Sequence, residues 1–457
     1  MSKTPAAPVE SRAGRPLTRY FQAASGPIAT AVAHFALSIV LLHGVSPSMF
    51  GKLSFMLIAS QLGAGVWGAL FCAPLPVMLA QARNAGSRDE DRIRRCIEAS
   101  NLFGASVALA GFWCLAYAVG LGAIDGGLFA GYCSVYLLRW FARANAYVAQ
   151  RPLAALSSDI VYSSVLLAML ATMTVWPTLL TLHSVCVALL LAAIVSLPPF
   201  GAAYLRSQFV AVSVKDMRGY PAVWRQHSGW SLAGVVTTEA TANSHAYLLT
   251  MFAGPGTFAP IAASALLIRP IGVFVNALTE MERPSVARLL GQGDHARAFH
   301  TLRLFRTIML VTWLLGAGLA VLILAYVPSL VFPSSYTFRF LVIGTSLWML
   351  VMFARQWRAP DSVLLQAAGD FRTLARASML SACSSVVAVV GLLATSEPVW
   401  SIGGIVVGET ICTLWTWRQA QRQRTVLADG DLVKNTFVPS VPKRLRNMGA
   451  DFSMEKK

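Results

Sequence analysis

The stretch of sequence that decides the fold runs from 229 to 306. It begins with GWSLAGVVTTEATANSHAYLLTMFA (Gly229–Ala253), passes a short turn, GPG (254–256), and continues with TFAPIAASALLIRPIGVFVNALTE (257–280). Each apolar run is long enough for a helix to cross the hydrocarbon core of a bilayer, which takes ~20 residues. A polar loop rich in cations is expected from 282 to 303. The pattern therefore predicts a hairpin of two transmembrane helices.

Each of these two helices contains one charged residue near its middle. A charge at the centre of a bilayer costs at least ~2.5 kcal/mol. Glu239 and Arg269 lie at similar sequence distances on either side of Pro255, so a rise of ~1.5 Å per residue puts them at similar depth, where they can form an ion pair between helices. Pro270 and Gly272, however, leave backbone polar groups without helical hydrogen bonds at the same depth. Such irregular backbone is tolerated within a membrane only where it lies against protein or lines a water-filled cavity. We therefore favour a polar cavity.

The composition extends this pattern to the whole chain. With 56% hydrophobic and 12% charged residues and a mean hydropathy of +0.60, the protein is far more apolar than a soluble domain. Windows of about 20 residues predict an all-α polytopic membrane protein with about twelve spans. The predicted spans begin near Ala23, Leu53, Asn101, Gly127, Asp159, Leu179, Gly229, Thr257, Thr307, Tyr336, Leu374 and Val399.

The distribution of cations predicts the topology. Apart from Lys52, Arg269 and Arg339, the 37 Lys and Arg residues fall at the N-terminus, at the C-terminus, or at one and the same end of the predicted spans. Because cytoplasmic loops carry an excess of Lys and Arg, both termini are expected in the cytoplasm. The net charge of +17 then indicates topology and attraction to anionic membrane lipids, and no nucleic-acid partner is expected.

An internal repeat divides the chain into two halves. His34 and Gln61 are the main polar side chains of the first predicted hairpin, and adding 208 to its positions reproduces the second: 48–50 falls on 256–258 and Gln61 on Arg269. Transporters use such repeats to build a central site between halves. The predicted regions are an N-tail (1–22), two six-helix bundles (23–204 and 229–418), a linker (205–228) and a basic C-tail (419–457), mostly disordered from Arg418.

Further ionisable residues lie within the spans. Arg139 and Arg143 are four residues apart, so they share one face of a helix, although snorkelling to the headgroups also explains them. Asp159 is expected to cap a helix. Arg355 lies in an Arg-Gln-Trp-Arg stretch that also suits an interfacial anchor, and Glu409 is buried by position without a partner that the sequence identifies.

Together these groups predict a substrate site with an excess of guanidinium. Several arginines facing one cavity suit an anion, because guanidinium binds phosphate bidentately and stays charged. Glu239 and His245 would tune that charge or couple a proton, although a lone span histidine also suits a helix–helix hydrogen bond. The candidate site residues are Arg139, Arg143, Arg269, Arg355, Glu239, Asn243, His245 and Gln61.

Several other functions find no support in the sequence. The chain has no Walker A pattern, no metal-spaced histidine cluster and no paired carboxylates or Ser-His-Asp pattern on one side of the membrane. Its seven scattered cysteines indicate small apolar fillers. Gly404 and Gly408 form a small-xxx-small pair, which more often packs helices within one protomer than makes a dimer. The protein is therefore not expected to be an enzyme or to hold a cofactor, and H⁺ or Na⁺ is left open as a coupling ion.

Three short stretches resemble the polysaccharide transport family of the multidrug/oligosaccharidyl-lipid/polysaccharide (MOP) exporter superfamily. LHGVSPSMFGKLS (42–54) looks like the family turn after the first span, with Leu53 where an aromatic is common. FAGPGTFAPIAA (252–263) repeats this turn, with Ala259 in place of the usual glycine, and LLQAAGDFR (364–372) is similar to the connection between spans ten and eleven.

The resemblance implies two helical bundles around a cavity that opens alternately to each side, as in MATE-like transporters. It also implies a flippase that moves an undecaprenyl-pyrophosphate-linked oligosaccharide across the bacterial inner membrane for exopolysaccharide or surface polysaccharide synthesis. Its partners would be that substrate, membrane lipids, and a polysaccharide polymerase with the export machinery. The basic cavity residues of relatives correspond most naturally to Arg269 and Arg139.

Two alternatives belong to other classes. An ion-coupled multidrug exporter of the MATE-like type should have an acidic, aromatic-lined pocket for cationic drugs, and the excess of arginine speaks against it. A membrane glycosyltransferase or polymerase should show a large extracytoplasmic loop or an acidic metal-binding motif. The short loops on that side of this chain disfavour it.

Overall fold

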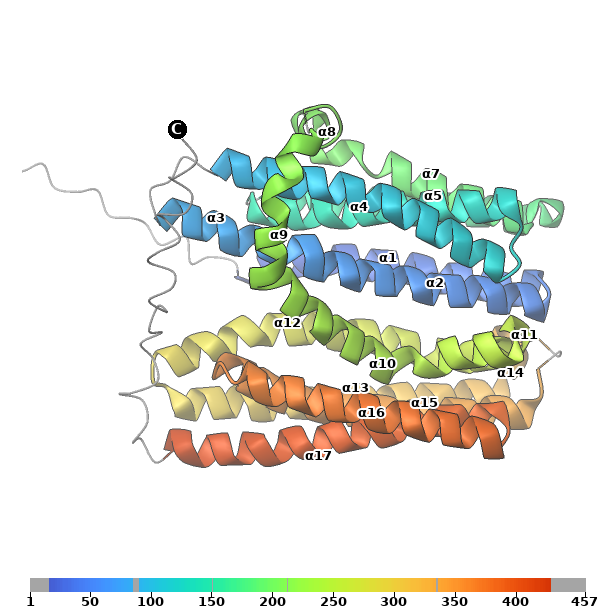
Figure 1. The fold of residues 1–457 in the computed structure, drawn as a ribbon. Coiled ribbons are helices and arrows are strands. Elements are labelled where there is room, and N and C mark those ends of the chain that lie inside the picture. Colours follow the sequence, from blue (N-terminus) through green and yellow to red (C-terminus); the bar gives the residue numbers. More distant parts are fainter. Residues whose placement is uncertain (1–15, 85–89, 150, 212, 334–335, 429–457) are drawn as a thin grey trace, which may run out of the picture.

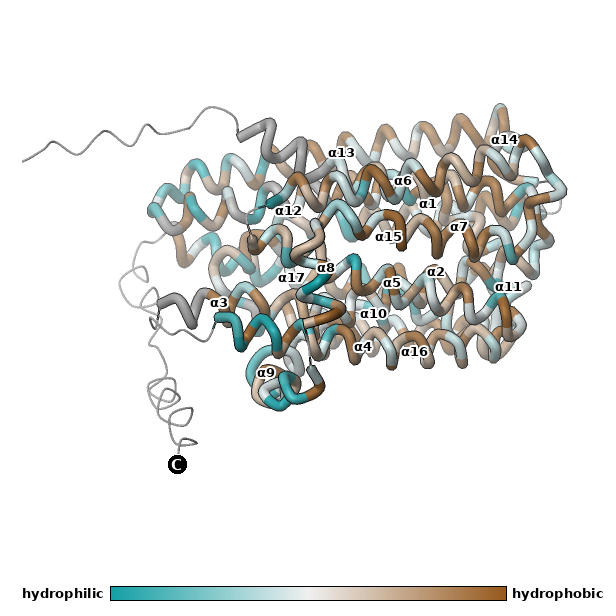
Figure 2. The backbone as a smooth tube through the Cα atoms, turned by 90° about the horizontal axis from the view of Figure 1, so that it is seen from above, coloured by the Kyte–Doolittle hydropathy of each residue, from teal (hydrophilic) through white to brown (hydrophobic). Residues whose placement is uncertain are grey.

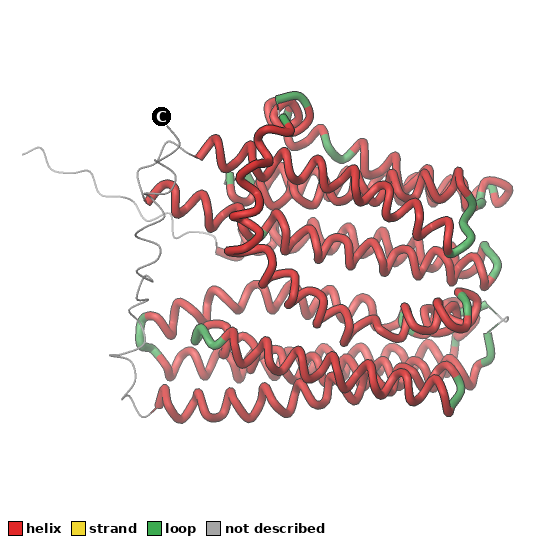
Figure 3. The backbone as a smooth tube through the Cα atoms, in the orientation of Figure 1, coloured by secondary structure: helices red, strands yellow, loops and turns green. Residues whose placement is uncertain are grey.

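A computed structural model describes residues 16–84, 90–149, 151–211, 213–333 and 336–428, and its regular structure is helical (Figure 3). The α-helices are α1 (Pro16–Gly44), α2 (Pro47–Trp67), α3 (Pro74–Asn84), α4 (Glu90–Ala118), α5 (Ala123–Val148), α6 (Pro152–Val175), α7 (Leu182–Val195), α8 (Ala202–Phe209), α9 (Tyr220–Val223), α10 (Gly229–Ala253), α11 (Pro255–Ser264), α12 (Arg269–Gly291), α13 (His295–Tyr326), α14 (Pro328–Val331), α15 (Phe338–Ala367), α16 (Phe371–Thr395) and α17 (Ser401–Ala428). Short π or 3₁₀ turns join several of them, including η1 (Gly68–Cys72), η4 (Val214–Gly219), η5 (Trp224–Ser228) and η6 (Leu266–Ile268).

The long helices run side by side in two bundles, α1–α7 and α10–α17, here called the N-half and the C-half (Figure 1). Equivalent helices of the repeat have equivalent neighbours. α1 packs on α6 as α10 packs on α16, and α4 packs on α5 as α13 packs on α15. In the same way, α5 contacts α7 as α15 contacts α17. The two halves therefore share one packing scheme, as the predicted repeat requires.

Ten stretches of the described chain are long and apolar enough to cross a membrane. The two other predicted spans correspond to α5 and α10, which are of similar length but are not among the ten. Polar residues lower their hydropathy, and several of these are candidate site residues. In Figure 2, hydrophobic segments fill the middle of the bundle and hydrophilic ones gather toward the end where α3, α9 and the tip of α12 lie. This distribution is what a bundle crossing a bilayer requires.

The helix boundaries agree with the predictions in apolar regions and differ at the basic ends. α10 coincides with the predicted 229–253, and the second predicted helix is broken by η6 just before Pro270. The predicted loop at 282–303 is wrong, because α12 continues to Gly291 and α13 begins at His295. The predicted tail after Arg418 is helical as far as Ala428, and the rest of both predicted tails lies largely outside the described residues.

The halves meet most closely through α2 and α11, at the end opposite the basic segments (Figure 1). A Cβ atom placed on Gly51 would lie 1.9 Å from the carbonyl oxygen of Pro255 and 3.3 Å from the Cβ atom of Ala259. Gly51 and Ala259 are equivalent positions of the 208-residue repeat. The pseudo-two-fold axis between the halves therefore passes close to this contact, as equivalent positions meet at such an axis.

The contact between α16 and α17 uses the small-residue pair. A Cβ atom on Gly404 would lie 2.5 Å from the backbone nitrogen of Val389, and one on Gly408 would lie 2.6 Å from the Cβ atom of Ser385. Gly404 and Gly408 therefore pack helices within one protomer, as the sequence indicated.

Candidate functional site

Two arginines and one carboxylate form a buried cluster in the N-half. Arg139 and Arg143, one turn apart on α5, both form salt bridges with Asp159 on α6, the one from Arg143 at 3.0 Å. The side chains of Arg139 and Asp159 are each 1% exposed, so this arginine does not reach the headgroups. Arg139 Nε also donates to Ser158 Oγ at 3.0 Å. The N-half cluster, defined as Arg139, Arg143 and Asp159, thus has one more positive than negative group.

The position of Asp159 corrects the prediction that it caps a helix. The helix α6 begins at Pro152, so Asp159 lies two turns inside it and its side chain faces α5. A Cβ atom on Gly26 of α1 would come within 2.4 Å of Asp159 Oδ2. The missing side chain at Gly26 therefore lets α1 cover the cluster.

A chain of polar contacts connects the N-half cluster to the C-half. The guanidinium of Arg139 lies 4.6 Å from the ring centre of Tyr162, whose hydroxyl is 2.9 Å from Nε2 of His34. One turn farther along α1, Ser38 Oγ donates to the carbonyl oxygen of His34 and accepts a hydrogen bond from Arg269 Nη1. Arg139 and Arg269 are thus brought to the two ends of one network across the interface between the halves.

Arg269 is the first residue of α12, directly after the 3₁₀ turn η6. Pro270 follows in the first turn of the helix, where backbone N–H groups have no intrahelical partner, so the lack of an N–H group in proline costs no hydrogen bond. The side chain of Arg269 is partly buried, and within the described ranges no salt bridge to it is found. A hydroxyl is its hydrogen-bond partner instead.

Glu239 and Arg269 do not form the ion pair that the sequence left open as the alternative to a polar cavity, and each makes other contacts. Glu239 Oε1 accepts hydrogen bonds from Asn243 Nδ2 at 2.9 Å and from the hydroxyl of Tyr247, both on its own helix α10. Similar depth therefore did not produce the ion pair, because Arg269 turns toward α1 and Glu239 stays on α10.

The surface of α10 that carries Glu239 faces α2. The rings of Tyr247 and Phe55 pack edge to face at 5.8 Å, and a Cβ atom on Gly65 would lie 3.1 Å from Val235. The two helices run in opposite directions, and Gly65 lies beside Val235. Gln61 is one turn from Gly65 on α2, and Glu239 is one turn from Val235 on α10, so the exposed Gln61 lies at the level of Glu239. Gln61, Asn243 and Glu239 consequently belong to the interface between the halves.

The C-half contains a second cluster of the same kind. Arg355 Nε and Arg358 Nη1 on α15 contact the two carboxylate oxygens of Glu409 on α17 at 2.7 and 3.0 Å. The sequence identified Arg355 but could not name a partner for Glu409. His245 is 1% exposed and lies between the rings of Phe258 and Trp348, and within the described residues its Nδ1 atom has no hydrogen-bond partner.

A third cluster was not predicted. Asp361 on α15 accepts Arg306 of α13 at 2.7 Å and Arg424 of α17 at 3.0 Å, and its side chain is fully buried. Spacing along α15 gave no signal for it, because Arg358, one turn before Asp361, binds Glu409 instead. The four arginines of the predicted site therefore occupy three places, with Arg139 and Arg143 together, Arg269 linked to them, and Arg355 in the C-half.

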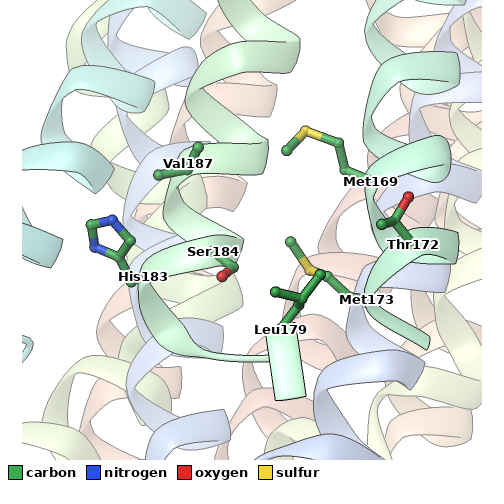
Figure 4. A pocket seen from close by; sticks show the side chains of 7 residues that line it. All are labelled: Met169, Thr172, Met173, Leu179, His183, Ser184 and Val187. Atoms are coloured by element: carbon green, nitrogen blue, oxygen red, sulfur yellow. The ribbon is translucent and has the colours of Figure 1, made fainter. Parts of the chain in front are cut away.

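A cavity of about 420 Å³ lies elsewhere, between α6 and α7. Figure 4 shows the sulfur-containing side chains of Met169 and Met173 facing it, whereas the ring of His183 points away. His183 Nδ1 instead contacts Asp125 at 2.9 Å. The cavity contains none of the predicted site residues.

No family model matches the chain, and no curated protein matches its sequence. Solved structures do match its fold. An inward-facing multidrug resistance MATE family transporter of the MOP superfamily is 11% identical with a TM-score of 0.65, over 90% of this chain and 99% of that one. A variant of the Vibrio cholerae MATE transporter VcmN is 14% identical, with a TM-score of 0.61 over 91% and 98%.

A third match is a MOP superfamily transporter from Pyrococcus furiosus, for which reverse polarity of the binding pocket is said to suggest a different function. It is 12% identical with a TM-score of 0.60, over 90% of this chain and 96% of that one. At such identities the likeness establishes the fold. The predicted all-α, MATE-like fold is therefore confirmed over 90% of the chain.

Proposed function

We propose that the protein is a MOP-type flippase for a lipid-linked oligosaccharide carrying a pyrophosphate, such as an undecaprenyl-pyrophosphate-linked repeat unit of a surface polysaccharide. It would act in a bacterial inner membrane, with both termini in the cytoplasm, and would move its substrate without making or breaking covalent bonds. The observation that carries the proposal is Arg269, a guanidinium at the interface between the halves with a hydroxyl as its partner.

The charge balance of the interior supports an anionic substrate. Each of the three clusters combines two arginines with one carboxylate. Arg139 is connected to His34 through Tyr162, and Arg269 through Ser38, so a pyrophosphate near His34 would be within the field of two guanidinium groups. In a low-dielectric interior, a phosphate group offsets such an excess of charge and forms strong charge-assisted hydrogen bonds.

The contacts between the halves support alternating access. The halves are in close contact through α2 and α11 at the end opposite the basic segments, which the cation distribution assigns to the extracytoplasmic side. Movement of the two halves about this contact would expose the interface to one side at a time, as in transporters built from repeats.

The direct test is the replacement Arg269→Ala in proteoliposomes that contain a fluorescent undecaprenyl-pyrophosphate-linked oligosaccharide. Loss of one charge-assisted hydrogen bond, worth about 1.5–3 kcal/mol, should slow translocation about tenfold or more. Arg269→Lys should retain part of the rate. Arg339→Ala, at an exposed arginine, is the control and should behave as the unmodified protein. Translocation by Arg269→Ala at the unmodified rate would remove this residue from the mechanism.

The second candidate is an ion-coupled exporter of cationic drugs, favoured by the fold of the MATE structures and by the carboxylate of Glu239 at the interface between the halves. Glu239→Gln should abolish drug export if that function holds, whereas a flippase should keep most of its activity. Drug resistance after overexpression, with polysaccharide intact in a deletion strain, would decide for the exporter.

A further inference from the structure

The linker between the halves has an outward surface that combines apolar side chains with cations. Val210 and Val214 are 76% and 80% exposed, and Phe209 and Trp224 are 41% and 42% exposed. The same segment has four exposed cations and, in its sequence from 205 to 228, one acidic residue, Asp216. The cations are Arg206, Lys215, Arg218 and Arg225.

The opposite surface of the linker is fixed to the N-half by buried polar contacts. On α8, Ser207 Oγ donates to Glu98 Oε2 at 2.6 Å, and Gln208 Nε2 donates to the carbonyl oxygen of Glu98 at 3.0 Å. Farther along, the hydroxyls of Tyr220 and Ser228 both donate to the carbonyl oxygen of Leu70, at 3.0 and 2.9 Å. Because these contacts hold the inner surface, the apolar and basic side chains keep facing outward.

The linker also lies at a defined level of the bundle. Figure 1 shows it crossing the long helices inward of the ends of α3, α12 and α17, not beyond their tips. A span of ~20 residues counted back from the far end of α4 at Ala118 reaches Ala99, next to Glu98. The linker contacts α4 at Glu98 and Asn101, so it lies at the edge of the hydrocarbon layer.

Apolar and aromatic side chains interspersed with cations, held flat at this level, are typical of segments that bind an anionic membrane surface. We propose that the outward surface of the linker is a docking site for the anionic lipid headgroups of the adjacent leaflet. Its apolar side chains enter the boundary of the acyl layer, and its cations contact lipid phosphates. This inference requires that the chain cross a membrane but is independent of its substrate.

Depth is tested with an environment-sensitive fluorophore on Val214→Cys in the full chain, with the exposed Cys114 and Cys383 replaced by serine. In nanodiscs of phosphatidylcholine and phosphatidylglycerol, lipids brominated near the headgroup should quench this probe. The same probe on Gln292→Cys, an exposed position between α12 and α13, should stay accessible to aqueous iodide. A probe at 214 as open to iodide as the one at 292 would overturn the proposal and indicate a soluble partner.

Headgroup charge is tested by native mass spectrometry of the protein with phosphatidylglycerol or phosphatidylcholine. In the double variant Arg218→Gln/Arg225→Gln, the ratio of bound phosphatidylglycerol to bound phosphatidylcholine should fall by about tenfold or more. The reason is that each cation near an anionic surface strengthens binding severalfold. Arg297→Gln, an 81% exposed arginine at the start of α13, is the matched control and should keep it. Equal binding of both lipids by the unmodified chain would refute the role of the cations.

Discussion

At the scale of single residues, the interior is organised by carboxylates that each serve two arginines. Asp159, Asp361 and Glu409 are buried, and a lone carboxylate or guanidinium would be unstable at such positions. A buried ion pair gains little over apolar packing, but its loss is costly because the remaining charge is left uncompensated. These side chains therefore fix how helices pack inside each half and leave a surplus of positive charge.

Replacing Asp159 by alanine should strongly destabilise the N-half. Arg139 would remain 1% exposed without a counter-charge, so we expect a loss of about 3–5 kcal/mol, measured by thermal unfolding in detergent. Asp125→Ala is the control, since its partner His183 is 58% exposed, and it should change stability by less than about 1 kcal/mol. Equal effects of the two replacements would contradict this account.

The sequence predicted which residues are unusual better than it predicted their partners. Arg139 and Arg143 were placed on one face from their spacing alone, and both do meet one carboxylate. That carboxylate, Asp159, was assigned to a cap because a single sequence does not show which helix lies opposite. Glu239 and Arg269 were matched by depth, but depth fixes only one of three coordinates and leaves the rotation of each helix open.

At the scale of helices, hydropathy identified the membrane-embedded parts and missed the extensions. Ala, Arg, Leu and Glu are good helix formers and occur in the polar region 282–303 that apolar windows exclude, so α12 and α13 continue into it. Pro270 indicated irregular backbone at Arg269, because it removes one helical hydrogen bond, but Pro360 does the same inside the unbroken α15, so the break itself did not follow from the proline alone.

The packing of α16 on α17 predicts that alanine at two different glycines changes the stability of the protein in opposite directions. Gly404→Ala should destabilise the protein by about 1–3 kcal/mol, because its Cβ atom would lie 2.5 Å from the backbone of Val389. Gly391→Ala, on α16 with nothing within 4 Å, should stabilise it by about 0.5–1 kcal/mol through the usual helix preference. Thermal unfolding of both variants distinguishes the outcomes, and stabilisation by Gly404→Ala would show that the two helices are not in close contact.

At the scale of the whole molecule, two similarly built halves meet through several helix contacts. α1 contacts α12, and α10 contacts α2; these two contacts are equivalent under the repeat. α2 and α11 meet near the axis itself. The 208-residue offset in the sequence predicted this equivalence, but not which helices form the interface. That information depends on the lateral arrangement of spans, which hydropathy does not contain.

The contact at the axis should control closure of the end of the bundle at which α2 meets α11. Gly51→Val cannot coexist with the present separation of α2 and α11, because its Cβ atom would overlap the carbonyl oxygen of Pro255. Spin labels on His43→Cys and Met251→Cys, at the ends of α1 and α10, should therefore report longer distances in this variant. Gly111→Val, on α4 with free space around it, should leave the distances unchanged. An unaltered distance distribution in Gly51→Val would exclude this contact as a gate.

The meeting of Gly51 with Ala259 has a consequence for how the two halves can diverge. Elsewhere in the repeat, each copy of a position has its own surroundings and is free to change alone. Here a methyl group at 51 would meet the second copy itself: first the carbonyl oxygen of Pro255 at 1.9 Å, and then the Cβ atom of Ala259, its own counterpart, at 3.3 Å. The backbone of the second copy of the turn thus requires glycine at position 51 of the first copy, so this position cannot gain a side chain unless the turn around Pro255 moves with it.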